Sequence, residues 1–157
     1  MSSEDKDYVI ELTQDRELVK SILTDPDLYK LISDDFSPLA KDFEPIWDDS
    51  RIHLLVKKED KVIGVTIGHF ISGCCMVGHF NILPKYWGDN KDANRACIDW
   101  VFENTNAIKC IAFIPEYCKE VLKSALSMGC YEEGYIANSI LKDGKLYGQW
   151  VVGIDSE

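Results

Sequence analysis

The sequence lacks three features that would each place it in a particular class of proteins. Its six cysteines form no Cys-x-x-Cys pair and have no histidine at zinc-finger spacing, which argues against a structural metal site. No apolar run approaches the ~20 residues that a bilayer-spanning helix needs. The opening Met-Ser-Ser-Glu-Asp-Lys has no apolar core of the kind that a targeting segment carries. We therefore expect a cytoplasmic protein with reduced thiols and no metal.

Basic side chains are scarce in the first third of the chain. Residues 1–50 hold 14 acidic and 5 basic side chains, whereas the remaining residues hold 13 and 12. An acidic region repels the phosphates of nucleic acids and of anionic membranes, so we expect neither as a partner. Two interpretations of this acidity remain, a solvated face that aids solubility and a docking face for a basic protein.

The length and the hydrophobic pattern predict a single α/β domain over residues 1–157. A chain of 157 residues, 46% of them hydrophobic, can bury one substantial core. The apolar periodicity predicts the order β-α-α-β-β-β-α-β-α-β-β. This order predicts a mixed, mostly antiparallel sheet of about seven strands, with about four helices packed on both faces. Residues 1–7 and 155–157 are expected to be flexible ends.

Local signals predict where several of these elements begin and end. Asp25-Pro26 predicts a helix start, because Asp caps a helix and Pro is tolerated at its first position. Apolar spacing predicts a later helix from about Ala93. The nearly continuous apolar run 108–114 predicts a strand that is covered on both faces. Asp143-Gly144 predicts a tight hairpin between the last two strands.

Three stretches in this order resemble the GNAT superfamily of acyl-CoA-dependent N-acyltransferases, and in detail the small GNAT-like proteins of tailed bacteriophages. Val62-Ile63-Gly64 is similar to the entry of the family's third strand. Residues 81–88 are similar to its fourth strand, the proline after it and the start of the acetyl-CoA loop. Residues 114–130 are similar to its fifth strand and fourth helix. The resemblance implies a GNAT fold that binds acetyl-CoA and an amine substrate.

The acetyl-CoA loop departs from the family pattern Gln/Arg-x-x-Gly-x-Gly/Ala. Aligned on Pro84, the first position is Trp87 and the two small positions are Asn90 and Asp92. Glycines there let backbone N–H groups approach a pyrophosphate, and the helix N-terminus adds partial positive charge. In this chain side chains occupy that approach, and Asp89 and Asp92 bring negative charge toward an anion. A structural alternative is that Asn90 or Asp92 caps the helix that follows.

The resemblance also implies which residues line the acetyl-CoA site. The cofactor-binding candidates are Ile82, Leu83, Trp87, Gly88, Asp89, Asn90 and Cys118. A backbone N–H near Ile82 or Leu83 could polarise the thioester oxygen. The family's Tyr, which protonates the leaving thiolate, corresponds to Ala125, and its Asn corresponds to Cys118. The usual general acid is therefore absent from that position.

Two other residues are candidates for catalysis. His79 lies on the predicted fourth strand and, with an ordinary pKa of ~6.5, is the candidate general base. Its alternative is a half-buried histidine with only local hydrogen bonds. Tyr135, and secondarily Tyr147, could donate a proton from the last hairpin, although strand tyrosines commonly serve packing. Cys118 at a helix start could be a nucleophile, but no Cys-His-Asp arrangement supports it.

Two main functions follow from these residues. The first is an N-acetyltransferase that transfers acetyl from acetyl-CoA to an unknown amine. The second is a GNAT-like domain that has lost catalysis and acts as a phage virion, head-assembly or partner-binding protein, with a phage or host protein as its partner. A related version is a phage factor directed at a host protein. For a phage-encoded protein the location is the host cytoplasm or the virion.

Overall fold

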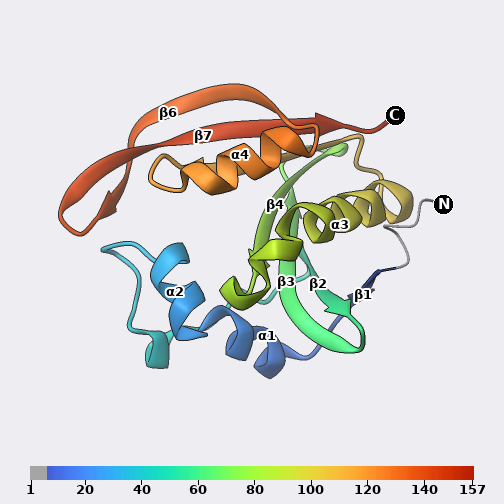
Figure 1. Cartoon of the computed structure of the whole chain (residues 1–157), viewed down its shortest axis with the longest axis horizontal. Coiled ribbons are helices and arrows are strands. Elements are labelled where there is room, and N and C mark those ends of the chain that lie inside the picture. Colours follow the sequence, from blue (N-terminus) through green and yellow to red (C-terminus); the bar gives the residue numbers. More distant parts are fainter. Residues whose placement is uncertain (1–6) are drawn as a thin grey trace.

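The computed structural model describes residues 7–157, so the flexible end predicted for residues 1–7 lies outside the described part except for residue 7. The chain folds in the predicted order into one seven-stranded sheet with helices on both faces (Figure 1). The strands are β1 (Tyr8–Leu12), β2 (Arg51–Lys58), β3 (Lys61–Phe70), β4 (Cys75–Ile82), β5 (Lys109–Pro115), β6 (Tyr131–Lys142) and β7 (Lys145–Asp155). The helices are α1 (Arg16–Leu23), α2 (Pro26–Ile32), α3 (Asn90–Asn104) and α4 (Lys119–Ser127), with short 3-10 segments η2 (Ala40–Asp42) and η3 (Pro84–Asp89).

The sheet order is β1-β2-β3-β4-β5-β7-β6, and only the β4–β5 pair is parallel. Successive strand residues face opposite sides of a sheet, so β2 serves two cores. Leu55 packs with Val19 of α1 and Leu28 of α2 on one face. Leu54 packs with α3 on the other face. Helix α4 covers β5 and β7 on that same α3 side through Ala125.

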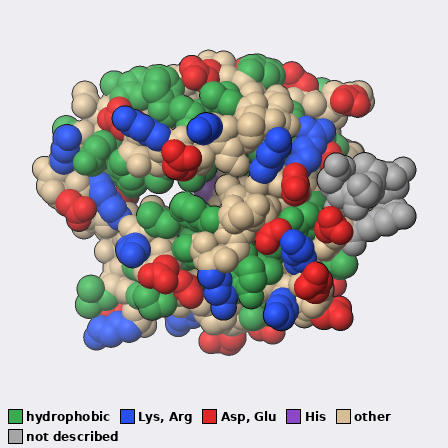
Figure 2. Space-filling view, in the orientation of Figure 1, with side chains coloured by type: hydrophobic (Ala, Val, Ile, Leu, Met, Phe, Trp, Pro, Cys, Tyr) green, Lys and Arg blue, Asp and Glu red, His purple; other side chains and the backbone are tan. Residues whose placement is uncertain are grey.

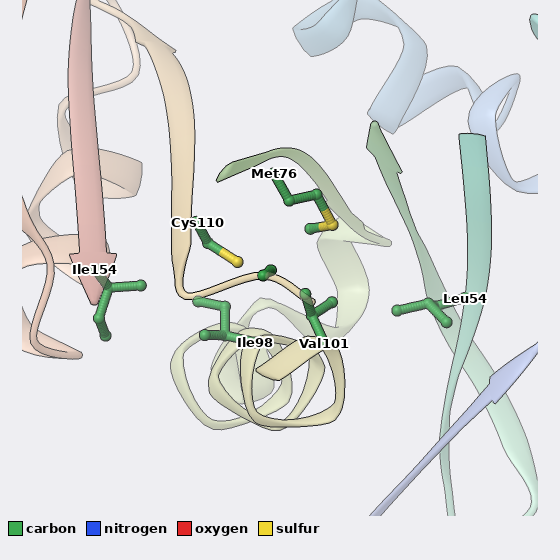
Figure 3. Close-up of a cluster of buried hydrophobic side chains, with 7 residues drawn as sticks. Leu54, Met76, Ile98, Val101, Cys110 and Ile154 are labelled. Carbon is green, nitrogen blue, oxygen red and sulfur yellow. The ribbon is translucent and has the colours of Figure 1, made fainter. Parts of the chain in front are cut away.

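Helix α3 holds together the two halves of the sheet, which are β1–β4 and β5–β7. Its inner side chains Ile98 and Val101 are almost completely buried. Figure 3 shows these side chains between strands of both halves. The cluster comprises Leu54, Met76, Ile98, Val101, Ala107, Cys110 and Ile154. A core that spans both halves compensates for the ladder between β4 and β5, which is only three residue pairs long.

Gly64 is required where β3 closely approaches β4. A Cβ atom at this position would lie 2.4 Å from the backbone oxygen of Asn81, which is far inside van der Waals contact. We expect Gly64→Ala to lower the free energy of unfolding by about 1–3 kcal/mol, because the two backbones must move apart. Urea denaturation measures this change. Gly73→Ala is the matched control, since a Cβ there meets nothing within 4 Å. Equal stability of the two variants would contradict this explanation.

Most of the boundary predictions are confirmed. Asp25 caps α2 by accepting from the N–H groups of Asp27 and Leu28. Asp143 and Gly144 both have positive φ (53° and 76°), as a tight hairpin turn requires. Within residues 7–157, no helix has the length and apolarity needed to cross a membrane.

Three predictions about individual elements were wrong. Helix α3 begins at Asn90 rather than near Ala93, because η3 leads directly into it. Its N-cap is Asp89, which makes no side-chain capping bond, so neither Asn90 nor Asp92 has the predicted capping role. Strand β5 is covered on one face only, and Phe113 on the other face is 40% exposed. An apolar run alone does not distinguish a strand covered on both faces from one that lines a cleft.

Candidate active-site cleft

A cleft passes through the sheet where β4 and β5 separate. Only Cys75–Val77 of β4 pair with Lys109–Ile111 of β5, although both strands continue beyond these residues. The gap forms a cavity of about 630 Å³, lined by α3 and α4 on one face and by α2 and β6 on the other. Figure 2 shows the hollow open at the surface, with histidine atoms inside it. Two ligands could therefore enter from opposite faces and meet between the strands.

The free edge of β4 provides backbone hydrogen-bonding groups to this cleft. The Leu83 N–H donates to the Ile63 carbonyl oxygen at 2.9 Å, which directs Leu83 toward β3. Because backbone groups alternate along a strand, those of Gly78, Phe80 and Ile82 point to the side that β5 has left. The Trp87 indole Nε1 already donates to the Ile82 oxygen at 2.8 Å. The Ile82 N–H is therefore aimed at the cleft, whereas the Leu83 N–H is already bonded to β3.

Asp89 has its charge compensated at the start of α3. Its Oδ1 accepts a hydrogen bond from the Tyr8 hydroxyl at 2.7 Å and lies 2.6 Å from the Lys58 Nζ. The hydrogen bond from Lys58, and then that from Tyr8, lowers the pKa of the Asp89 carboxyl. The carboxylate is thus ionised but paired with a cation. The repulsion of an anion that the sequence predicts for Asp89 is correspondingly offset, while Asp92 remains exposed.

The first turns of α3 place two asparagine residues at the cleft. The Asn94 Nδ2 donates to Asn90 Oδ1 at 3.0 Å, and both residues line the cavity. Asn94 Oδ1 is buried and has no hydrogen-bond partner among the described residues. An unsatisfied buried acceptor costs about 1–3 kcal/mol, and because this oxygen is closed to solvent, a ligand in the cleft reaches it only if the side chain turns. Trp87 also lines the cavity, and the neighbouring Gly88 is exposed with open space around it.

His79 lines the cleft and has a second histidine beside it. Its ring stacks on that of His69 of β3, with centroids 5.5 Å apart and planes at 17°. Solvent reaches His79 through the cleft, yet protein surrounds most of the ring, and this desolvation is the main cause that lowers its pKa. The positive charges of His69 and Arg51 lower the pKa further. His79 is therefore neutral near pH 7, as a general base must be.

All three histidines of the chain lie on the face of the sheet that α1 and α2 cover, on β2, β3 and β4. His53 of β2 is buried and stacked on Trp47 at 3.9 Å, and it does not line the cleft. The Nδ1 of His69 is buried without a partner among the described residues. The pairing of His69 with His79 depends on the β3–β4 register, which the sequence pattern alone does not provide.

The other predicted catalytic residues are placed differently. Tyr135 is outside the cavity lining, with its hydroxyl donating to Glu116 at 3.0 Å and its ring against Trp150 at 4.7 Å. Cys118 lines the cavity, but burial raises the pKa of its thiol, which opposes the nucleophile interpretation. Among residues 7–157, no three His, Cys, Asp or Glu side chains are grouped as a metal site.

Tyr117 is a cleft residue that the sequence interpretation missed. It lies between β5 and α4, lines the cavity, and packs edge-on against Tyr147 with ring centroids 4.9 Å apart. Burial, followed by nearby negative charges including Asp34, raises the pKa of Tyr117 to about 12. Its phenol is therefore protonated at any pH near neutrality and can donate a hydrogen bond in the cleft.

Solved structures with this fold include N-acetyltransferases. Spermidine N-acetyltransferase from Vibrio cholerae, in complex with CoA and spermine, matches with a TM-score of 0.80 and 13% identity over 96% of each chain. A protein assigned as a phosphinothricin N-acetyltransferase matches with a TM-score of 0.75 and 18% identity over 96% of this chain and 99% of its own. No protein-family model and no curated protein matches the chain significantly. The likeness shows the fold, which is the GNAT fold that the sequence predicted; the phage resemblance stays a prediction.

Proposed function

We propose that this chain is an acyl-CoA-dependent N-acetyltransferase that transfers acetyl from acetyl-CoA to an amine. The observation that carries the proposal is the cleft through the sheet, because it lets a thioester and an amine approach from opposite faces. Holding two reactants in line in this way converts a bimolecular reaction into an effectively unimolecular one. The fold of the solved relatives supports the same proposal.

The residues of the α3 side of the cleft fit acetyl-CoA. Amide groups of the ligand can pair with the free edge of β4, which lines the cleft. The N–H groups at the start of α3 have no side-chain cap, and they favour an anion. Asp89 opposes that anion less than its charge suggests, because Lys58 is bound to it. When bound, acetyl-CoA supplies an acetyl thioester for transfer.

His79 and the β4 edge then supply two of the three functions that transfer requires. His79 accepts the proton that the amine nitrogen loses as it bonds to the acetyl carbon. The Ile82 N–H donates to the carbonyl oxygen, where negative charge develops. Ala125 provides no proton for the departing thiolate. A thiol of ordinary pKa near ~8.5 is a tolerable leaving group as its anion, so this loss slows transfer without abolishing it.

Calorimetric titration with acetyl-CoA, followed by an assay of thiol release with a panel of amines, tests this proposal. We expect micromolar binding, about −8 kcal/mol, and amine-dependent release of free thiol. Absence of binding would contradict the proposal and favour the second function, a GNAT-like domain that binds a protein partner. Binding without release for any amine would contradict the catalytic part of the proposal.

Lys58→Met should weaken acetyl-CoA binding about two- to fivefold, because the Asp89 carboxylate then faces the anion uncompensated. An exposed ion pair contributes little, so the expected loss is small. The dissociation constant from calorimetry measures the effect. Lys57→Met is the matched control, since Lys57 pairs with Glu11 at 2.6 Å instead. Adding Asp89→Asn to Lys58→Met should restore binding, and equal constants for the two lysine variants would refute the explanation.

The pH dependence should reflect the neutral form of His79. Its pKa is lowered from the usual 6.5, first by desolvation and then by His69 and Arg51. A base with a lowered pKa is active above that pKa and loses activity as the pH falls through it, so the midpoint should lie below 6.5. His69→Gln removes one positive neighbour and should move the midpoint upward. Asp34, the acidic residue that lines the same cleft, is present in both proteins, so its charge does not affect the comparison.

Two measurements separate this effect from titration of the amine. The NMR chemical shift of the His79 ring, followed from about pH 4 to 8, gives the pKa of His79 directly and without turnover. Comparing kcat/KM of the wild type and of His69→Gln with one amine cancels the ionisation of that amine. An unchanged or lower midpoint in the variant would contradict the influence of His69.

A further inference from the structure

The acceptor pocket is the part of the cleft on the α2 side of the sheet, where His79 lies. Alternation along β5 places Phe113 on this side, opposite Ile114, which packs under α4. The apolar side chains of the wall are Leu31, Ile32, Phe113, Ile136 and Ile140, and its polar ones besides His79 include Asp34, Ser139 and Gln149. Gln149 Nε2 donates to Ser139 Oγ at 3.1 Å, so these two polar groups bind each other and the apolar groups offer most of the contact surface. The pocket thus suits an apolar body beside the nitrogen that reacts.

Charge in this pocket is limited to one carboxylate. Asp34 is the only acidic residue among those that line the cleft in the described part of the chain, and no Lys or Arg lines it. Its Oδ1 already accepts from the Phe36 N–H at 2.8 Å and from the Ser37 hydroxyl at 3.3 Å. An ammonium group that enters an apolar site without a partner loses its hydration uncompensated. A substrate with several ammonium groups is therefore poorly matched.

A strap closes one side of the pocket. We use this name for residues 33–35 after α2 together with the β6–β7 turn, residues 141–144, which lie side by side in Figure 1. The Asp35 N–H donates to Leu141 O at 2.9 Å, and its carboxylate accepts from the N–H groups of Asp143 and Gly144 at 2.7 and 2.8 Å. Lys142 Nζ donates to Ser33 O at 2.5 Å. An extended peptide cannot pass between these two segments while they are bonded together.

We infer that the acceptor is a small primary amine with a largely apolar body, rather than a polyamine or a peptide. This inference rests on the proposed function and names its substrate class. Direct contact with Phe113 and Ile136 would supply most of the affinity, and His79 would receive the amine proton. The acceptor class therefore differs from the spermidine named for a protein of the same fold.

The test compares hexylamine and 2-phenylethylamine with spermidine and a short peptide that has a free N-terminus. We expect kcat/KM with acetyl-CoA to be at least about tenfold higher for the two apolar amines. Each amine is also titrated into the protein in the presence of CoA, which reports binding without turnover. Tighter binding of the apolar amines supports the inference, whereas a preference for spermidine or peptide overturns it.

A charge placed in the pocket sharpens this test. Ile136→Asp adds a carboxylate to the wall and should shift the preference toward spermidine by about tenfold. Leu146→Asp is the matched control, since Leu146 is exposed and does not line the cleft. Acetyl-CoA binding is measured for every variant. If the wild type binds acetyl-CoA but prefers spermidine, only the acceptor inference is contradicted. If the wild type does not bind acetyl-CoA, the proposed function itself is contradicted.

Discussion

His79→Gln should lower kcat/KM by about 10²–10⁴, which is the usual contribution of a positioned general base. The histidine lines the cleft and is held neutral by desolvation, so it can accept a proton at pH 7. Glutamine fills similar space and keeps hydrogen-bonding groups but cannot take up the proton. Steady-state release of thiol, with the best amine of the panel, measures the loss.

The control for this variant is His53→Gln, which removes a histidine from the same face of the sheet outside the cleft. It should keep kcat/KM within a few fold while altering stability. Acetyl-CoA binding of His79→Gln should stay near the wild-type value, because the proton transfer is lost rather than the cofactor site. If His79→Gln retained more than a third of the wild-type rate, His79 would be a packing residue, the alternative considered from the sequence.

Ala125→Tyr should raise kcat by about tenfold or more, because it returns a proton donor to the position that the family resemblance assigns to the general acid. Ala125 lines the cleft, so a phenol there can reach the cavity, but Ala125 is 8% exposed and packs with Ile114 and Val152, so the larger side chain also crowds this core. A donor beside the leaving thiolate lowers the barrier for its departure. Pre-steady-state thiol release at saturating acetyl-CoA measures the gain.

Ala125→Phe is the matched control for that gain. It adds the same ring without the hydroxyl, so any loss of activity through crowding is common to both variants. We expect kcat of Ala125→Tyr to exceed kcat of Ala125→Phe by about tenfold or more, since the two variants differ only in the hydroxyl that donates the proton. Equal values would mean that the leaving group needs no acid or that the ring points away from it. Thermal unfolding of both variants confirms that each remains folded.

Much of the fold follows from local sequence signals. The strands and helices have clear apolar periods, and their order constrains the sheet to few arrangements. The turn at Asp143-Gly144 and the start at Asp25 could be predicted because each depends on residues that are neighbours in the sequence. The coverage of β5 could not be predicted, because an apolar face in contact with a cleft has the same composition as one beneath a helix.

The site was less predictable, because its geometry depends on tertiary contacts. His79 and Ile82 lie at the cleft as the resemblance implied, since both belong to β4. The pairing of Asp89 with Lys58 joins residues 31 positions apart, and no local pattern indicates it. Tyr135 lies opposite Trp150 outside the cleft, whereas the next residue, Ile136, lines it, and this register follows an irregularity of β6 between 132 and 134. A bulge changes which face the following residues occupy.

The short ladder between β4 and β5 has a consequence for how the molecule opens. Three residue pairs join the two halves of the sheet directly, and the buried cluster of α3 and the strap attach them elsewhere. The strand ladder itself therefore contributes little to joining the halves at this gap. A ligand that pairs with the free edge of β4 would substitute for the missing strand contacts. Amide hydrogens near the gap should then exchange more slowly when the ligand is bound. The fraction of protein with ligand in the cleft would thus determine how firmly the two halves of the sheet are joined.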